Sequence, residues 1–344
     1  MFEFLSVLWF FLIFVLIAGY FVLDGFDLGV GALSPFIAKN DEERAVLRRA
    51  IGPVWDGNEV WLLTAGGALF AAFPNAYATT FSGFYLAVML VLFGLIVRAV
   101  SFEFRAGDPG WAKLWDGCFF VGSLLPALLL GVAVGNIFAG IPMDEAGNYA
   151  GVPLLGLITP FTLLTGLLGL AMFLAAGAAW AALKAPLPSE LRERAVRLRL
   201  PLQVIALALF AVVSVFALAL VGTEMDPALA PARWLCAALV VAALGASIVF
   251  GRSPSGDLRA FLAQSGAMVV LVALLACSMF PVLVNATPDS VGPAITLANA
   301  ASSELSLFWM TVITAVGLPL VLAYHVIIYR TFRGRVKPED LTHS

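Results

Sequence analysis

Two aspartates lie in a segment of the sequence that is otherwise apolar, as expected for a helix surrounded by lipid. Asp24 and Asp27 occur in GYFVLDGFDLGVGAL, at the end of the first long apolar stretch. A spacing of three residues places both carboxylates on one face of a helix. A charge inside a bilayer costs about 2.5–3.5 kcal/mol on insertion scales, so ionisable residues there are functional candidates by default. We therefore expect the pair to serve function, with the glycines around it allowing another helix or water to approach closely.

Further polar residues occur at the ends of the next three apolar stretches. They are Asp56, Asn58 and Glu59 in WDGNEVW, Arg98 and Glu103 in VRAVSFEFR, and Asp116 in LWDGCFF. Chains of carboxylates can carry protons, and an arginine can hold one of them ionised. We expect a proton pathway formed by Asp24, Asp27, Asp56 and Glu103, supported by Arg98, Asn58, Glu59 and Asp116.

A structural role is the alternative for several of these acids. An aspartate in the first turn of a helix interacts favourably with the helix dipole and can cap the helix. For Asp56 and Asp116, capping and function remain equally open. The acids can also pair with Arg98, in which case they would stabilise the fold or a subunit contact.

The composition requires a membrane protein. Hydrophobic residues make up 62% of the 344 residues and charged residues 12%, with a mean hydropathy of +1.00. A soluble domain carries about 25% charged residues. Long apolar runs recur near the roughly 20 residues that span a bilayer, and only helices satisfy the backbone over such lengths. We predict an all-α polytopic membrane protein.

The apolar runs predict nine membrane-spanning helices. Their approximate ranges are 4–33, 51–73, 76–98, 115–139, 154–183, 200–222, 232–250, 258–284 and 304–330. With the N-terminus outside and the C-terminus in the cytoplasm, all but one of the 19 Lys and Arg residues lie inside, and the exception is Arg233. This distribution agrees with the positive-inside rule.

We expect residues 1–344 to form a single integral membrane domain. The first four helices, at 4–139, carry the acidic cluster at the cytoplasmic side, with Glu103 just beyond the third helix. The last five, at 154–330, read as a scaffold with almost nothing ionisable inside. A polar cytoplasmic linker, 184–199, divides the two groups, and the outer loops are short and rich in Pro and Gly.

Histidine and cysteine are too scarce for an obvious metal or haem site. The two histidines are His325, near the inner end of the last span, and His343 in the tail. Haem ligation by two histidines on different helices is therefore not expected, and His325 reads as an interfacial residue. The three cysteines stand singly inside apolar runs and favour packing over metal binding. The basic cytoplasmic residues indicate topology, and no nucleic-acid partner is expected.

The motifs LDGFDLGVG, GPVWDGNEVWLLTAGGALFAAFP, FSGFY and WDGCFFVGSLLPALLLGVAVGN closely resemble subunit II of the cytochrome bd-type quinol oxidases. The resemblance implies a multi-pass protein of the bacterial inner membrane that is paired with subunit I. In that family, subunit I carries two haems b and one haem d together with the quinol-oxidising loop, and subunit II usually has no haem. The complex oxidises quinol and reduces dioxygen to water, with protons drawn from the cytoplasm.

The resemblance also implies site residues and further ligands. The acid of the WDGN motif corresponds to Asp56, those of the DGFD motif to Asp24 and Asp27, and the acid after the third helix to Glu103. Residue 59 is Gln in some relatives and Glu here. Some members hold a structural quinone, ubiquinone or menaquinone, and small single-helix accessory subunits occur, with quinol and membrane lipid as further partners.

Two other functions remain open on the residues alone. A proton- or cation-coupled secondary transporter would also be polytopic with membrane acids, but it would work without a haem-bearing partner. A quinone-reactive anchor for another redox complex would need a different partner and would not consume oxygen.

Overall fold

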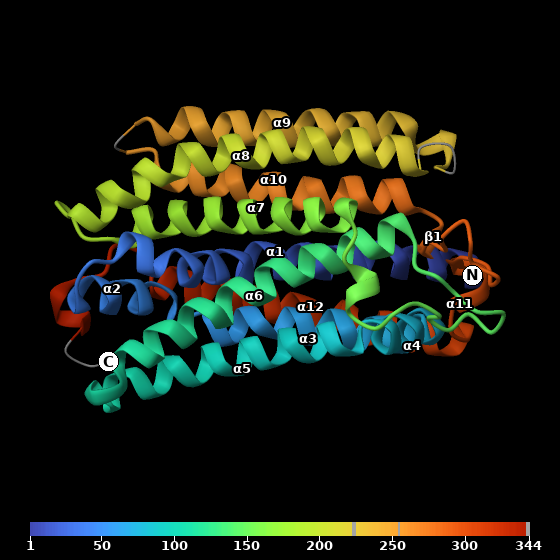
Figure 1. Cartoon of the computed structure of the whole chain (residues 1–344), viewed down its shortest axis with the longest axis horizontal. Helices are drawn as coiled ribbons and strands as arrows, with labels where there is room; N and C mark the ends of the chain where they lie inside the picture. The colour runs from blue at the N-terminus through green and yellow to red at the C-terminus, as the bar shows by residue number, and fades with distance from the viewer. Residues whose placement is uncertain (222–224, 254, 342–344) are drawn as a thin grey trace.

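The computed structural model describes residues 1–221, 225–253 and 255–341. It is a bundle of long helices that run side by side along one axis (Figure 1). The helices are α1 (Phe2–Ile37), α2 (Asp41–Ile51), α3 (Trp55–Ala72), α4 (Pro74–Gly83), α5 (Tyr85–Gly107), α6 (Ala112–Ala139), α7 (Pro160–Lys184), α8 (Glu190–Val221), α9 (Ala230–Gly251), α10 (Asp257–Met279), α11 (Leu297–Ala300) and α12 (Glu304–Thr331). Two short strands, β1 (Val282–Val284) and β2 (Ile295–Thr296), pair antiparallel.

Eight helices in the described part of the chain are long and apolar enough to cross a membrane: α1, α5, α6, α7, α8, α9, α10 and α12. The all-α membrane fold is therefore confirmed. The remaining predicted span, 51–73, corresponds to α3, whose 18 residues include the polar residues Asp56, Asn58 and Glu59. The count of nine and the orientation stay predictions.

Helix α1 forms the centre of the bundle and packs against α3, α6, α7 and α10. Its closest approach is to α7, where a Cβ added to Gly29 would lie 1.9 Å from the backbone oxygen of Phe173. Gly177 of α7 meets the backbone of Gly29 in the same way. Small residues let helix backbones approach in a membrane, where apolar surface alone does not drive association. The expectation of close approach next to the aspartates is confirmed.

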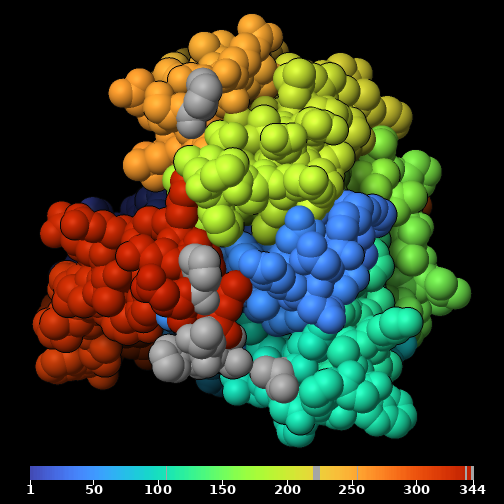
Figure 2. All heavy atoms as spheres, turned by 90° about the vertical axis from the view of Figure 1, so that its left-hand side faces the viewer, coloured from blue at the N-terminus to red at the C-terminus, as the bar shows by residue number. Residues whose placement is uncertain are grey.

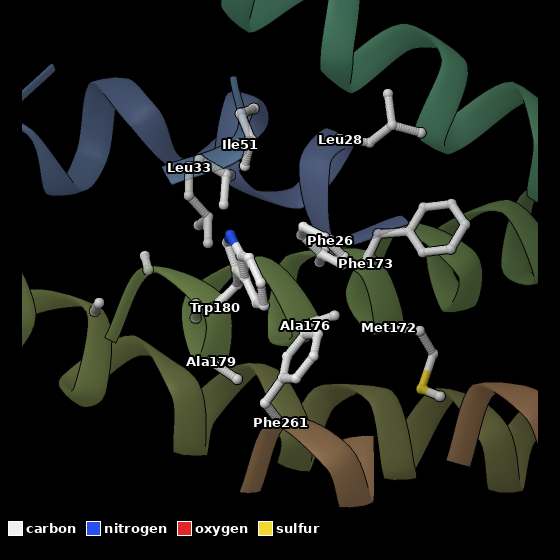
Figure 3. Packing of buried hydrophobic residues seen from close by; sticks show 14 of the residues in the cluster. Phe26, Leu28, Leu33, Ile51, Met172, Phe173, Ala176, Ala179, Trp180 and Phe261 are labelled. Carbon is white, nitrogen blue, oxygen red and sulfur yellow. The ribbon is translucent and has the colours of Figure 1, made fainter. Parts of the chain in front are cut away.

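Trp180 of α7 is the centre of the inner half of the core (Figure 3). Its ring lies 4.3 Å from that of Phe26 and 4.9 Å from that of Phe261, measured between centroids. Its indole N–H donates to the carbonyl oxygen of Ala50 at 3.0 Å. Because Ala50 belongs to α2, this bond fixes the short helix α2 against the bundle.

The second and third predicted spans are wrong in their bounds. Residues 41–51 form the separate helix α2, which buries Val46 and Leu47 and exposes its charged face. The predicted span 76–98 is divided between α4 and α5, which break at Phe84. Helix α5 then continues to Gly107, so Glu103 lies within the helix and not beyond it.

The predicted linker 184–199 is also wrong, because α8 begins at Glu190. The hydroxyl of Ser189 accepts a hydrogen bond from the backbone N–H of Arg192 at 3.2 Å, as a helix cap does. Ion pairs of Glu190 with Arg194 and of Glu193 with Arg197 then follow the i,i+4 spacing that supports a helix. The polar residues therefore extend α8 beyond its apolar part toward the end that is predicted to face the cytoplasm.

The end of the bundle that is predicted to face outward carries more structure than the sequence indicated. Helix α10 ends at Met279, before Pro281, and the chain continues into the β1–β2 hairpin. The backbone N–H of Ile141 donates to the carbonyl of Asn285 at 3.0 Å, which joins the hairpin to the loop after α6. The predicted span 258–284 is therefore five residues too long at its C-terminal end.

Candidate functional site

Arg98 is the centre of a buried ion cluster between α1, α3 and α5. Its side chain and that of Asp24 are fully buried, and Arg98 Nη2 donates to Asp24 Oδ1 at 2.7 Å. The same nitrogen pairs with Glu59 Oε1, whose side chain is 22% exposed. Helix α6 closes over the arginine because it has a glycine there: a Cβ on Gly122 would lie 2.8 Å from the backbone nitrogen of Arg98.

A second buried chain of hydrogen bonds lies beside this cluster. Asn58 Nδ2 donates to Asp27 Oδ2 at 2.7 Å and to the carbonyl oxygen of Leu23 at 3.1 Å. The hydroxyl of Tyr329, on α12, donates to Asn58 Oδ1 at 3.1 Å. Asn58 therefore holds α1, α3 and α12 together around the Asp27 carboxylate.

Five buried polar atoms in this region have no hydrogen-bond partner among the described residues. They are the hydroxyl of Tyr20, Asp24 Oδ2, Asp27 Oδ1, and Nε and Nη1 of Arg98. Buried polar groups are nearly always hydrogen-bonded to protein or to ordered water. Water molecules bound between the two aspartates would supply the missing hydrogen bonds.

The carboxylates of α3 lead from the surface toward the arginine. Asp56, in the first turn of the helix, is exposed, and Glu59 follows three residues later on the same face. Glu59 touches Arg98, which in turn touches Asp24. The side chain of Asp56 itself makes no ion pair with the cluster in the described structure. Its predicted membership of the pathway stays a prediction.

Glu103 and Asp116 lie away from the buried cluster. Glu103 is exposed on α5, with no ion pair to a described residue. Asp116 pairs with Arg48 at 2.8 Å and with Arg105 at 3.1 Å, and with Arg44 at 3.5 Å. Burial lowers the pKa of the Arg48 guanidinium from its ordinary value, and the Asp116 carboxylate opposes that change. Asp116 therefore ties α2, α5 and α6 together.

The scaffold helices contain a buried ionic contact that the sequence analysis missed. Asp257, at the start of α10, is 3% exposed and pairs with Arg192 at 2.9 Å and Arg199 at 3.3 Å. Arg335 of the C-terminal tail reaches the same carboxylate at 3.2 Å. These residues lie outside the predicted spans 200–222 and 258–284, because α8 and α10 begin earlier than predicted. The signal lay in residues 190–199, which the sequence analysis placed in a linker.

His325 does not fit the role of a haem ligand. Its Nε2 accepts from the indole N–H of Trp61 at 3.2 Å, and its Nδ1 lies 2.9 Å from the carbonyl oxygen of Val321. Both ring nitrogens are therefore engaged within the protein. His343 lies outside the described residues. No group of three or more His, Cys, Asp or Glu residues suited to a metal ion occurs within the described chain.

An apolar cavity of about 250 Å³ lies between helices α6 to α10. Phe138, Phe161, Phe210 and Leu275 contribute to its walls. Arg233 and Trp234, in the first turns of α9, also line it. The cavity therefore combines an apolar interior with polar groups at one end.

Comparison with known proteins places the whole chain in one group. Residues 5–332 match the family model described as cytochrome bd terminal oxidase subunit II. The chain is 34% identical to cytochrome bd-I ubiquinol oxidase subunit 2 of Escherichia coli (strain K12), with 100% of this chain and 99% of the relative covered. It is 35% identical to cytochrome bd ubiquinol oxidase subunit 2 of Bacillus subtilis (strain 168), with 97% of each covered.

The fold also has a solved counterpart. A chain in the structure of bd oxidase from Geobacillus thermodenitrificans superposes with a TM-score of 0.76, covering 95% of this chain and 98% of that one. The sequence identity is only 17%, so this likeness concerns the fold.

Proposed function

Because this chain belongs to the family of cytochrome bd terminal oxidase subunit II, we propose that it provides a cytoplasmic proton inlet for the oxidase. The chain is a subunit of a quinol:oxygen oxidoreductase complex and a multi-pass protein of the bacterial inner membrane, and its partner is subunit I. Family membership favours this reading over a coupled secondary transporter.

In this proposal the chain stabilises subunit I and binds no haem itself. Haems b and d, bound to subunit I, supply the redox chemistry of quinol oxidation and oxygen reduction. Support comes from His325, whose two ring nitrogens already have partners in this chain. Reduction of dioxygen to two waters consumes four protons, and the task left to this chain is to deliver protons from the cytoplasm.

The observation that carries the proposal is the cluster of unpartnered buried atoms next to the Glu59 carboxylate, which is only partly buried. Glu59 is within reach of water and contacts Arg98, while Asp24 and Asp27 each direct one unpartnered oxygen into the buried region. Water bound between these groups would join Glu59 to the two aspartates. Arg98 would keep the charge of the cluster balanced while a proton passes.

Replacing Glu59 by Gln tests the inlet. Glutamine preserves the shape of the side chain but cannot take up a proton, so we expect quinol-driven oxygen consumption to fall by about a hundredfold or more, the lower end of the range for loss of a proton-transfer group. The reduced-minus-oxidised haem spectrum and the ratio of the two subunits should stay unchanged. The measurement is oxygen uptake by the purified complex.

The matched control is Glu42→Gln, which removes one exposed cytoplasmic carboxylate on α2. It should leave oxygen uptake unchanged, whereas Glu59→Asp should restore part of the rate. Asp56→Asn should slow turnover less than Glu59→Gln, because water reaches the exposed site. Full activity of Glu59→Gln at normal assembly would contradict the inlet. Loss of haem together with subunit I would indicate the structural alternative.

We also propose that a structural quinone, ubiquinone or menaquinone, occupies the apolar cavity between α6 and α10. The apolar walls suit an isoprenoid chain, and Arg233 and Trp234 provide polar contacts for a quinone ring. Ser214→Phe would fill the cavity from α8, and we expect the extracted quinone per complex to fall by half or more. Val215→Phe, on the outward-facing side of the same helix, is the control. Equal quinone content in both variants would contradict this location.

A further inference from the structure

A second cavity lies at the cytoplasmic end of the bundle, where the C-terminal tail returns to α7. It has a volume of about 250 Å³, far more than the about 10–15 Å³ that one water needs. The ends of α2, α7 and α12, the segment between α2 and α3, and tail residues 333–337, 339 and 340 form its walls. Figure 2 shows this end of the molecule, with the tail in red beside α2 in blue.

The lining of this cavity is strongly basic. The cations are Arg49, Lys184, Arg333, Arg335 and Lys337, and the acids are Glu339 and Asp340. The balance is three positive charges within one concave site. A charge excess of this kind, enclosed by protein, raises the local concentration of anions.

Two of the cations hold the walls in place. Lys184 Nζ donates to the carbonyl oxygen of Phe332 at 2.6 Å and lies 4.8 Å from the ring centre of Trp180. Arg335 donates to the carbonyl oxygens of Ala182 and Ala185 at 2.8 and 2.7 Å, and pairs with Asp257. These bonds fix the cavity without using the remaining cations.

The other three cations have no carboxylate partner within the described chain. Arg49 lies 5.9 Å from the ring centre of Phe332, and Arg333 and Lys337 are exposed. Guanidinium groups bind phosphate oxygens through two parallel N–H donors, and lysine adds a point charge. The three side chains therefore form the part of the cavity that is available to a ligand.

We propose that this cavity binds a phosphate-bearing anion, either the headgroup of an anionic phospholipid or free phosphate. The site lies at the cytoplasmic ends of two membrane helices, and basic pockets between such helices on that side bind anionic headgroups. The tail carries its two acids on the short turn Pro338–Leu341, which packs against α2, and the five cations of the lining still exceed these acids by three charges. The proposal does not depend on the proton inlet.

The test uses the complete two-subunit complex, stripped of loosely bound lipid in mild detergent. Phosphatidylglycerol, phosphatidylcholine and inorganic phosphate are titrated separately, and bound ligand is counted by native mass spectrometry. The cavity variant is Arg49→Gln, Arg333→Gln, Lys337→Gln. The control variant is Lys113→Gln, Arg252→Gln, Arg259→Gln, which removes the same charge from exposed cytoplasmic positions outside the cavity.

We expect the wild-type complex to bind the anionic ligand, and the cavity variant to bind it at least about tenfold more weakly, because three of the basic residues that attract the anion are removed. The control variant should bind like the wild type. Preference for phosphatidylglycerol over phosphatidylcholine, without displacement by phosphate, identifies the lipid as the source. Displacement of lipid by millimolar phosphate identifies free phosphate. Equal binding by the cavity and control variants would overturn the proposal.

Discussion

At the scale of single residues, Arg98 offsets the free-energy cost of burying the charged acids next to it. Asp24 is fully buried and its only described ion pair is with Arg98. Removing one partner of a buried ion pair costs about 3–5 kcal/mol, because the other charge stays behind without compensation. The arginine is therefore needed for folding, and any proton transfer through the cluster depends on it as well.

Arg98→Gln should destabilise the complex strongly. We expect the temperature at which half of the haem is released to fall by several degrees, together with a lower yield of the paired subunits. In the double variant Arg98→Met, Asp24→Leu, both buried charges disappear, so much of the lost stability should return. Oxygen uptake should stay low in both variants. If the double variant regains full oxygen uptake, the cluster serves structure alone.

The sequence predicted which residues form this cluster more accurately than it predicted which of them are exposed. A charge inside an apolar stretch must find a partner, and the structure pairs Arg98 with Asp24 and Glu59. Asn58 donates to Asp27 beside them. Spacing along a helix gives neighbours on one face, but not the rotation of that face toward the bundle. For this reason nothing in the sequence distinguished exposed Asp56 from buried Asn58, two residues away.

Two tyrosines of the site were missed at the same scale. Tyr20 and Tyr329 contribute hydroxyls to the buried region. Tyrosine is common at membrane interfaces, where an apolar ring and a polar tip are both satisfied. A tyrosine near the end of a span therefore carries no sequence signal that separates an interfacial residue from a member of a buried network.

At the scale of helices, the contact of α1 with α7 is the most sensitive to added volume. Gly29→Ala would place a methyl group 1.9 Å from the Phe173 carbonyl oxygen, and backbone cannot give way as a flexible side chain does. We expect a loss of about 1–3 kcal/mol, as for overpacked cores, with a lower melting temperature of the complex.

The matched control for this contact is Gly266→Ala on α10, where an added Cβ meets nothing within 4 Å. It should leave the melting temperature unchanged or raise it slightly, because alanine favours a helix over glycine. Equal melting temperatures for the two alanine variants would show that α1 and α7 can separate without cost.

Hydropathy located the apolar helices but not the polar ones. Seven of the predicted spans overlap a single long helix each, from α1 to α12, because the apolar runs there are uninterrupted. Helix α2 and the first ten residues of α8 have the composition of loops. They are helical because side chains cap them and because Glu and Arg residues form ion pairs. A mean hydropathy taken over a window of residues does not detect these interactions.

At the scale of the whole molecule, the two ends of the bundle differ in charge. The start of α8, all of α2 and the C-terminal tail share one end, and this end holds the ion pairs of Asp116 and Asp257 (Figures 1 and 2). The predicted orientation places it in the cytoplasm, where Lys and Arg accumulate. The hairpin β1–β2 and the loop after α6 then face outward.

Single cysteines test this orientation. In a variant lacking Cys118, Cys236 and Cys277, Glu145→Cys should react with a membrane-impermeant maleimide in intact spheroplasts. Arg252→Cys should react only after the membrane is permeabilised, since the two exposed positions lie at opposite ends. The reverse pattern would invert the topology, and labelling of both from outside would contradict the count of spans between them.

The attachment of the tail has a consequence for how the protein is made. Arg335 and Val336 bind the end of α7, and Arg335 also reaches Asp257, although both residues are synthesised after α7 and α10. The ends of α7 and α10 therefore lack these contacts until the chain has been made beyond residue 336. We expect a chain that stops before residue 335 to leave these ends uncovered and to be degraded by proteases faster than the 344-residue chain.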